Sequence, residues 1–252
     1  MLSEELLTKT LKHHEKFKNE SFVVKPSLPI LYFGNLSAYL NSTLRIVTVG
    51  KNPSDNEFRL TRDDPFSFVR FPKWAASKSN LIEALDAYFE TNPLRSWFSS
   101  FEPILNGMNS SFYRRKNYNN NALHTDVCSP LATSPTWSIL SKSEQRLLYK
   151  DGYEIWSELI EQLQPDVMLI SIPEKLFTSI INSTGKNLIS FKNKKDGTSR
   201  KKPYNASAHE FTLKSGKKIQ VIFGRAANKP FDTITNEQKG LIGEEIINFL
   251  DR

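Results

Sequence analysis

The chain has 252 residues, of which 38% are hydrophobic and 12% are aromatic. This content of large apolar side chains is enough for a buried core and excludes a disordered chain, and the length predicts a single domain over residues 1–252. The formal net charge of +7 favours an anionic partner, first of all nucleic acid, although a chain that is basic only for solubility would carry the same surplus.

The only cysteine, Cys128, excludes an internal disulfide and a multi-cysteine zinc site, and it is typical of a reducing cytoplasm. No apolar run approaches the ~20 residues of a membrane-spanning helix, and the N-terminus does not read as a signal peptide. We therefore expect a cytoplasmic monomer with no membrane partner and no cofactor.

The predicted elements alternate between helices and short apolar strands. An N-terminal helical and extended segment covers residues 1–43 and begins with a helix at 1–18, whose His13–His14 pair we assign to a solvated face rather than to a metal site. Strands follow at 44–49, 122–127, 166–172 and 219–223, and helices at 77–91, 94–106, 143–163 and 236–251, with a further helical region that opens at 134–137.

Nearly all-apolar strands that alternate with helices indicate an α/β fold, here a three-layer α/β/α domain with a central, mainly parallel four-stranded sheet. In such sheets ligands bind outside the carboxyl ends of the strands. This rule directs attention to the loops 50–73, 126–137, 172–176 and 224–232.

Two of these loops place a short polar side chain at the end of a strand. The first reads Gly50-Lys51-Asn52-Pro53-Ser54, in which glycine allows a tight exit and proline stiffens the backbone behind the Asn52 amide. An ordinary Asn-Pro turn would read the same way. The second carries Asp126, followed by Cys128, which has no evident general base and is better explained as a small buried hydrophobe than as a nucleophile.

These loops and the order of the four strands over residues 44–250 resemble the uracil-DNA glycosylase superfamily, nearest to its single-strand-selective monofunctional and mismatch-specific branches. The family's Gly-x-Asn-Pro-Gly/Ser motif is matched by residues 50–54. The resemblance implies that Asn52 positions the attacking water, that Gly50, Lys51, Pro53 and Ser54 line the substrate site, and that Asp126 stands where the family has an asparagine that reads the flipped base.

Two departures from the family pattern matter. Its last loop normally begins His-Pro-Ser, with the histidine supporting charge on the departing base, whereas the loop at 224–231 has no histidine. Either Arg225 or Asn228 substitutes as the donor, or catalysis is weaker, or the leaving base differs. The second departure is Asp126 in place of asparagine.

The aspartate can be interpreted physically. An ionised carboxylate only accepts hydrogen bonds, so it repels the O4 of uracil and accepts well from the N4 amino group of cytosine. We therefore predict a cytosine-like or modified cytosine substrate, which suggests defence against phages that carry decorated cytosine. Asp126 could instead cap a turn or pair with a basic residue, and the alternative functions are base-excision repair of uracil or another deaminated base, an inactive nucleic-acid-binding protein, and a small-molecule hydrolase.

The mechanism implied by the resemblance begins with extrusion of the target nucleotide from the helix. Asn52 would place water beneath the sugar, Asp126 would fix the base edge with Cys128 beside it, and Arg225 or Asn228 would stabilise the departing base. No metal is required. For the aromatic that stacks on the flipped base we rank Phe58 first, before Phe66 and Phe68, although each would equally suit the core.

Basic residues interleaved with aromatics suit contact with nucleic acid, although each such segment could be a solvated loop. One group belongs to a predicted basic insertion loop at 192–204, a second precedes the strand at 122–127, and a third lies in the last loop, where Phe231 is either a duplex wedge or a core residue. The predicted DNA-binding residues are Arg114, Arg115, Lys116, Lys194, Lys195, Arg200, Lys201, Lys202, Lys229 and Phe231.

Overall fold

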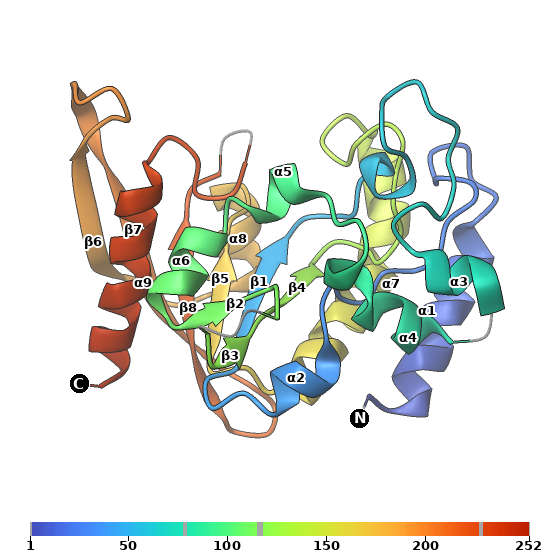
Figure 1. Ribbon diagram of the computed structural model, residues 1–252, viewed down its shortest axis with the longest axis horizontal. Coiled ribbons are helices and arrows are strands. Elements are labelled where there is room, and N and C mark those ends of the chain that lie inside the picture. Colours follow the sequence, from blue (N-terminus) through green and yellow to red (C-terminus); the bar gives the residue numbers. More distant parts are fainter. Residues whose placement is uncertain (1, 78–79, 115–117, 227–228, 252) are drawn as a thin grey trace. The chain divides into compact units, whose positions relative to one another are not determined.

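In the computed structural model, which describes residues 2–77, 80–114, 118–226 and 229–251, the chain divides into two compact units. Unit 1 comprises Met1–Leu36, Gly50–Leu94 and Leu123–Gln164, and unit 2 comprises Ser37–Val49, Arg95–Ala122 and Pro165–Arg252. Both units therefore contain segments that are distant in the sequence (Figure 1). The single domain over 1–252 stays a prediction.

Unit 1 is mainly helical. It contains α1 (Glu4–Phe17), η1 (Asp55–Phe58), α3 (Pro72–Ser77), α4 (Leu81–Asp86), η2 (Tyr88–Glu90), strand β4 (Leu123–Asp126) and α7 (Lys142–Leu163). A capping box between Ser141 and Glu144 fixes the start of α7. Helix α1 packs along α7, and Lys9 Nζ lies 3.3 Å from Glu158 Oε2 across them.

The core of unit 1 includes an aromatic cluster that holds the segment after β1 in place. The ring centroids of Phe33 and Tyr88 are 4.7 Å apart, those of Phe71 and Tyr88 are 5.3 Å apart, and those of Phe58 and Phe71 are 5.6 Å apart. Edge-on and tilted contacts of this kind add to the stabilisation from burial. They fix η1, which follows the Asn52 loop directly.

Unit 2 is built on a sheet. Its strands run in the order β1 (Ile46–Gly50, whose last residue belongs to unit 1), β5 (Val167–Ile170), β8 (Lys218–Gly224), β7 (Ser199–Thr212) and β6 (Lys186–Asn193). β1, β5 and β8 are parallel, with Val49 opposite Ile170 and Ile170 opposite Phe223, whereas β7 and β6 are antiparallel. The remaining elements are α2 (Leu36–Leu40), α5 (Arg95–Phe98), α6 (Glu102–Gly107), α8 (Glu174–Ile180), α9 (Asn236–Leu250) and the short pair β2 (Ser110–Ser111) and β3 (Asn120–Asn121).

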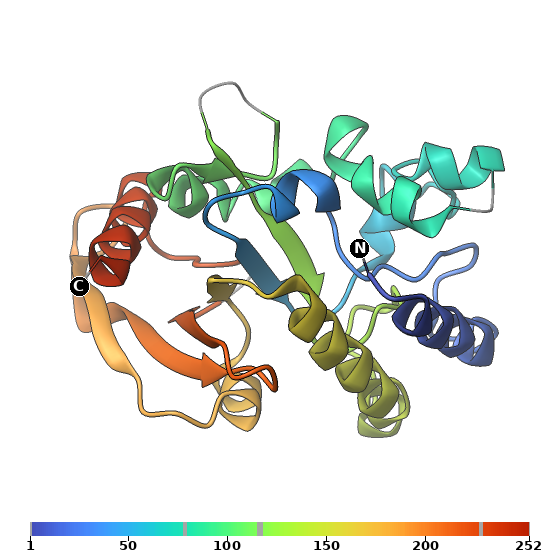
Figure 2. The same ribbon diagram turned by 90° about the horizontal axis from the view of Figure 1, so that it is seen from below.

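Helices cover both faces of the unit 2 sheet. Helices α6 and α9 pack together on one face, and α8 lies on the other (Figure 2). On the α8 side, the rings of Phe177 and Phe223 stack with centroids 4.2 Å apart. The α/β class is confirmed. Among the described residues, no helix is both long enough and apolar enough to cross a bilayer.

The predicted four-stranded sheet is too small. Within the described residues the main sheet has six strands, namely the four predicted ones and the hairpin strands β6 and β7. Of the predicted loop 192–204, only residues 194–198 connect the two strands, and the rest belongs to β6 and β7. At the turn Gly197 N donates to Lys194 O, and Gly197 has φ of 82°, a left-handed conformation that suits glycine.

Three helix predictions also need correction. Residues 77–91 and 94–106 are each interrupted, because the Asn80 side chain caps a new helix at Leu81 and Pro103 stands in the first turn of α6. Residues 134–137 form no helix, since the capping box starts α7 at Lys142.

The solvated position assigned to the histidine pair is wrong for His13. Its side chain is buried in unit 1, with Nε2 3.5 Å from Ser129 Oγ and its ring against Phe17. Burial lowers the pKa of His13 to about 4, which keeps the ring neutral near pH 7.

Candidate active site

The two predicted loops meet within unit 1. Val127 N donates to Gly50 O at 3.1 Å, and Cys128 N donates to Lys51 O at 2.8 Å. These bonds bring the end of β4 alongside the loop that leaves β1, as expected for carboxyl ends at one edge of a sheet. Pro53 is buried, and Ser54 forms a bridge with Thr133.

Gly50 allows this close approach. A Cβ atom at Gly50 would lie 2.5 Å from Asp126 Oδ1 and 3.0 Å from His124 Nε2. Both distances are shorter than ordinary van der Waals contact, so any larger residue would push the Asp126 carboxylate away. The requirement for glycine here comes from space rather than from backbone conformation.

The amide of Asn52 has a fixed orientation. Its Nδ2 donates to Pro53 O at 2.7 Å and to Thr133 Oγ1 at 3.2 Å. Because a backbone carbonyl only accepts, the contact with Pro53 assigns the nitrogen and the oxygen of the amide. Asn52 Oδ1 is left buried and without a hydrogen-bond partner among the described residues. An orphaned acceptor of this kind is costly unless a ligand or water completes it.

Asp126 is a buried carboxylate beside a buried histidine. The Asp126 side chain is 5% exposed, and its Oδ1 lies 3.7 Å from His124 Nε2. The two residues are two positions apart in β4, so their side chains lie on the same face. That spacing was readable in the sequence, and it would have added His124 to the candidate site.

Lys51 brings a cation to the same site. Its side chain is half-buried, and Nζ donates to Ser138 Oγ. Burial lowers the pKa of the Lys51 ammonium, while the charges of Cys128 and Asp126 act in the opposite direction.

Cys128 is buried, as expected of a small hydrophobe. Burial, together with the charge of Asp126, raises the pKa of its thiol well above the usual range. A thiol that resists ionisation is a poor nucleophile.

Glu57 is an acidic residue that sequence reasoning missed. It is 4% exposed, and Tyr88 OH donates to its Oε2. Burial raises the pKa of Glu57 to about 7; the Tyr88 hydrogen bond and Arg70 oppose the shift, and the Asp126 charge adds to it. The Arg70 guanidinium donates hydrogen bonds to three backbone carbonyls, and it thereby connects separate segments of unit 1. No periodic pattern marks Glu57, because η1 is only one short turn of 3-10 helix.

The first-ranked stacking aromatic is wrong. Phe58 is fully buried within the aromatic cluster, so its ring is committed to the core and cannot stack on a base. Phe66 and Phe68 are half-exposed, and the Arg59 guanidinium lies over the Phe66 ring at 5.1 Å. Of the three, Phe66 and Phe68 keep the accessibility that stacking requires.

The candidates in the last loop belong to unit 2. Arg225 is exposed and pairs with Glu174 at 3.3 Å. The wedge role for Phe231 is wrong, because the side chain is fully buried, with its ring centroid 6.0 Å from that of Phe101. Phe231 N also donates to Ser171 Oγ. Asn228, Arg115 and Lys116 lie outside the described residues.

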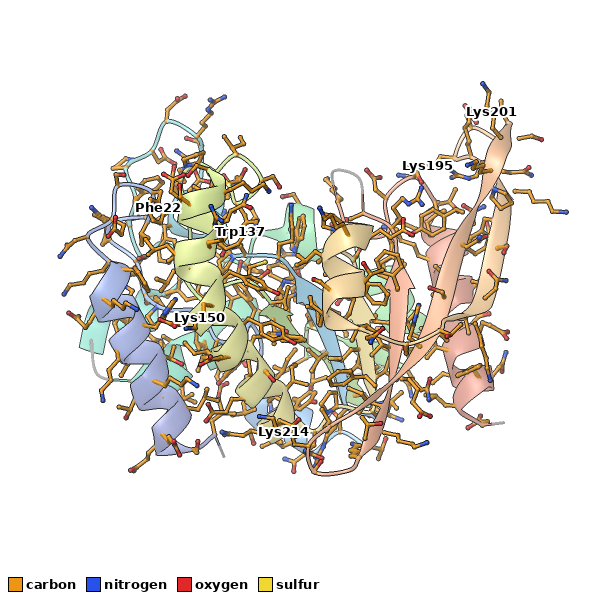
Figure 3. The ribbon with its side chains drawn as sticks, turned by 180° about the vertical axis from the view of Figure 1, so that it is seen from behind. Phe22, Trp137, Lys150, Lys195, Lys201 and Lys214 are labelled. Carbon is orange, nitrogen blue, oxygen red and sulfur yellow. The ribbon has the colours of Figure 1, made fainter. Side chains whose placement is uncertain are left out.

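The β6–β7 hairpin carries half of the predicted DNA-binding residues. Lys194, Lys195, Lys201 and Lys202 are exposed, as are Arg114 and Lys229 elsewhere in unit 2, and Arg200 is half-exposed. Figure 3 shows Lys201 towards the tip of the hairpin and Lys214 near the opposite end of β7. Lys195 pairs with Asp232 at 3.3 Å, and Arg200 donates to Thr233 O.

The described residues contain no group of three or more His, Cys, Asp or Glu side chains arranged to hold a metal ion. Comparison with protein-family models gives no match to the chain, and comparison with curated proteins gives none either.

Proposed function

We propose that the protein is a DNA glycosylase that hydrolyses the N-glycosidic bond of a cytosine-like or modified cytosine base. The observation that carries this proposal is the Asn52 amide, whose nitrogen is held by Pro53 and Thr133 while its oxygen has no partner among the described residues. An acceptor held rigidly at the end of a strand can accept a hydrogen bond from a water molecule, which orients a lone pair of the water oxygen for attack.

The second support is the Asp126 carboxylate on the neighbouring loop. Asp126 lies at the end of β4, and its backbone neighbours bond directly to the Asn52 loop. A buried carboxylate accepts from an exocyclic amino group and repels a carbonyl oxygen, so it favours cytosine over uracil. Placing such a base against Asp126 requires that the nucleotide leave the helix.

The third support is the exposed positive charge on the hairpin of unit 2. Lys194, Lys201 and Lys202 are exposed and are suited to contact phosphates without reading sequence. If the lysines of unit 2 contact phosphates, recognition of the base belongs to unit 1. We place the enzyme in anti-phage defence, where excision of decorated cytosine would leave abasic sites only in the invading DNA.

The experiment is an abasic-site assay on duplex and single-stranded oligonucleotides that contain uracil, cytosine, 5-hydroxymethylcytosine or glucosylated 5-hydroxymethylcytosine. We expect cleavable abasic sites in a cytosine-type substrate, and a loss of about 10²–10⁴ in rate for Asn52→Ala. The matched control is Asn56→Ala, because Asn56 is an exposed asparagine four residues away.

Three results would contradict the proposal in different ways. Release of uracil alone would overturn the choice of base. Full activity of Asn52→Ala would remove the water-positioning role. Inactivity on every substrate, combined with salt-sensitive DNA binding, would indicate a binding protein instead.

A further inference from the structure

The proposed reaction leaves one requirement unfilled. When the C1′–N1 bond breaks, its electron pair passes to the base, and the negative charge is shared with O2 of the pyrimidine. A positive donor near O2 lowers the barrier. In unit 2, Arg225 is exposed and its guanidinium is already engaged by the Glu174 carboxylate at 3.3 Å.

Unit 1 contains a cation at the candidate site itself. Lys51 stands between Gly50 and Asn52, and its carbonyl accepts from Cys128 N at 2.8 Å, which fixes the backbone from which the side chain departs. The half-buried ammonium has a neutral hydroxyl, Ser138 Oγ, as its hydrogen-bond partner. Ser138 is exposed, so water can replace the lysine as its partner at little cost.

The surroundings of Lys51 also suit a charge that acts on a ligand. Lys51 directly follows Gly50, where a Cβ would lie 2.5 Å from Asp126 Oδ1, so the lysine leaves the backbone next to the residue that we propose to read the base. Partial burial reduces screening by water, which makes a single positive charge more effective than it would be on the surface. Lysine is a compact charge on a flexible stem and can shift from Ser138 to a ligand oxygen by side-chain rotation.

We propose that Lys51 is a catalytic residue that donates a hydrogen bond from Nζ to O2 of the departing base. This inference rests on the proposed glycosylase function and names the residue that supplies positive charge where the family pattern has histidine. The C1′–N1 bond breaks, and the oxygen of the water held by Asn52 bonds to C1′. A proton from that water neutralises the released base.

The test combines substitutions with a change of leaving group. Lys51→Met and Lys51→Gln remove the charge, Lys51→Arg keeps it, and Lys150→Met is the control, because Lys150 is an exposed lysine on α7 of the same unit (Figure 3). Single-turnover release is measured from duplexes with cytosine or 5-fluorocytosine and, in parallel, with uracil or 5-fluorouracil. Fluorine stabilises the departing base anion and so reduces its need for a donor.

For the unfluorinated base we expect both neutral variants to lose 10²–10³ in rate, with DNA affinity within about threefold of the wild type. On the fluorinated base the loss shrinks to about tenfold or less, and Lys51→Arg regains part of the rate. A neutral variant with the wild-type rate, or an equal loss on both bases, would overturn the role of Lys51. A wild type that was inactive on these bases and on both hydroxymethylated cytosines would instead overturn the proposed function.

Discussion

The end of β4 in unit 1 and the β6–β7 hairpin in unit 2 differ in how they hold their polar groups. Asn52 and Asp126 lie in packed surroundings, and backbone hydrogen bonds tie their two loops together. Lys201 and Lys202 extend into solvent from a strand. The first region is preorganised for chemistry, which needs fixed distances, and the second suits attraction to a polyanion, which does not.

The loop after β8 differs from both regions. The sequence predicts that it contacts DNA, whereas in the structure it is hydrogen-bonded to the rest of unit 2. Ser171 bonds Phe231 N, Lys195 pairs with Asp232, and Lys239 Nζ donates to Pro230 O at 3.4 Å and to Ser100 O at 2.9 Å. The buried groups of this loop therefore stabilise unit 2, whereas the exposed lysines of the hairpin remain accessible to a binding partner.

The largest expected effect concerns Phe231. Because its side chain is fully buried against Phe101, Phe231→Ala should lower the free energy of unfolding by 3–5 kcal/mol. Phe66→Ala, at a half-exposed site, should cost about 0.5 kcal/mol. Chemical denaturation measures both. A wild-type stability for Phe231→Ala would return this residue to the set of candidate wedges.

The second prediction uses the buried carboxyl of Glu57. Its folded-state pKa of about 7 is above the ordinary 4.5, so the unfolded chain releases this proton first and stability falls as the pH rises from about 4.5 to 7. Glu57→Gln keeps an acceptor for Tyr88 OH and should raise stability at pH 8 by about 3 kcal/mol, with little change at pH 4.

Denaturation of both proteins across this pH range provides the measurement. Glu154→Gln, at an exposed carboxylate on α7, is the control and should leave the pH dependence unchanged. If Glu57→Gln showed the same slope against pH as the wild type, the carboxyl would not be protonated in the folded protein.

The third prediction concerns the space at Gly50. A methyl group there would meet Asp126 Oδ1 at 2.5 Å, so Gly50→Ala should displace the carboxylate and reduce base release about a hundredfold. Gly240→Ala is the control, because its Cβ would meet only Pro103 O, at 3.9 Å. Single-turnover rates of base release for the two variants provide the measurement. An unchanged rate for Gly50→Ala would show that base release does not depend on the position of the Asp126 carboxylate.

The smallest effect is expected at the hairpin. Replacing both Lys201 and Lys202 with alanine should reduce the slope of log affinity against log salt by about 2, with base release at saturating DNA unchanged. Lys214→Ala, near the other end of β7, should leave the slope almost intact (Figure 3). A slope that did not respond to the double substitution would place the DNA contact elsewhere.

The sequence predicts the parallel part of the fold well, because apolar strand runs at 166–172 and 219–223 and the helices around them are strong local signals. The contact between the loop that carries Asn52 and the end of β4 also followed from the rule that strand ends meet at one edge. The hairpin was not predicted because its strands are rich in lysine and serine. The alternation of buried Tyr204, Ala206 and Ala208 with more exposed positions is therefore weak in the sequence. Burial of Phe58, Phe231 and Glu57 depends on distant packing partners, which local patterns do not reveal.

The central claim is that Asp126 reads a cytosine-type base beside a water held by Asn52. The most direct test compares wild type and Asp126→Asn for release of 5-hydroxymethylcytosine and of uracil from otherwise identical duplexes. An amide offers both a donor and an acceptor, so we expect the ratio of cytosine-type to uracil release to fall at least about tenfold in the variant. An unchanged ratio would contradict the claim.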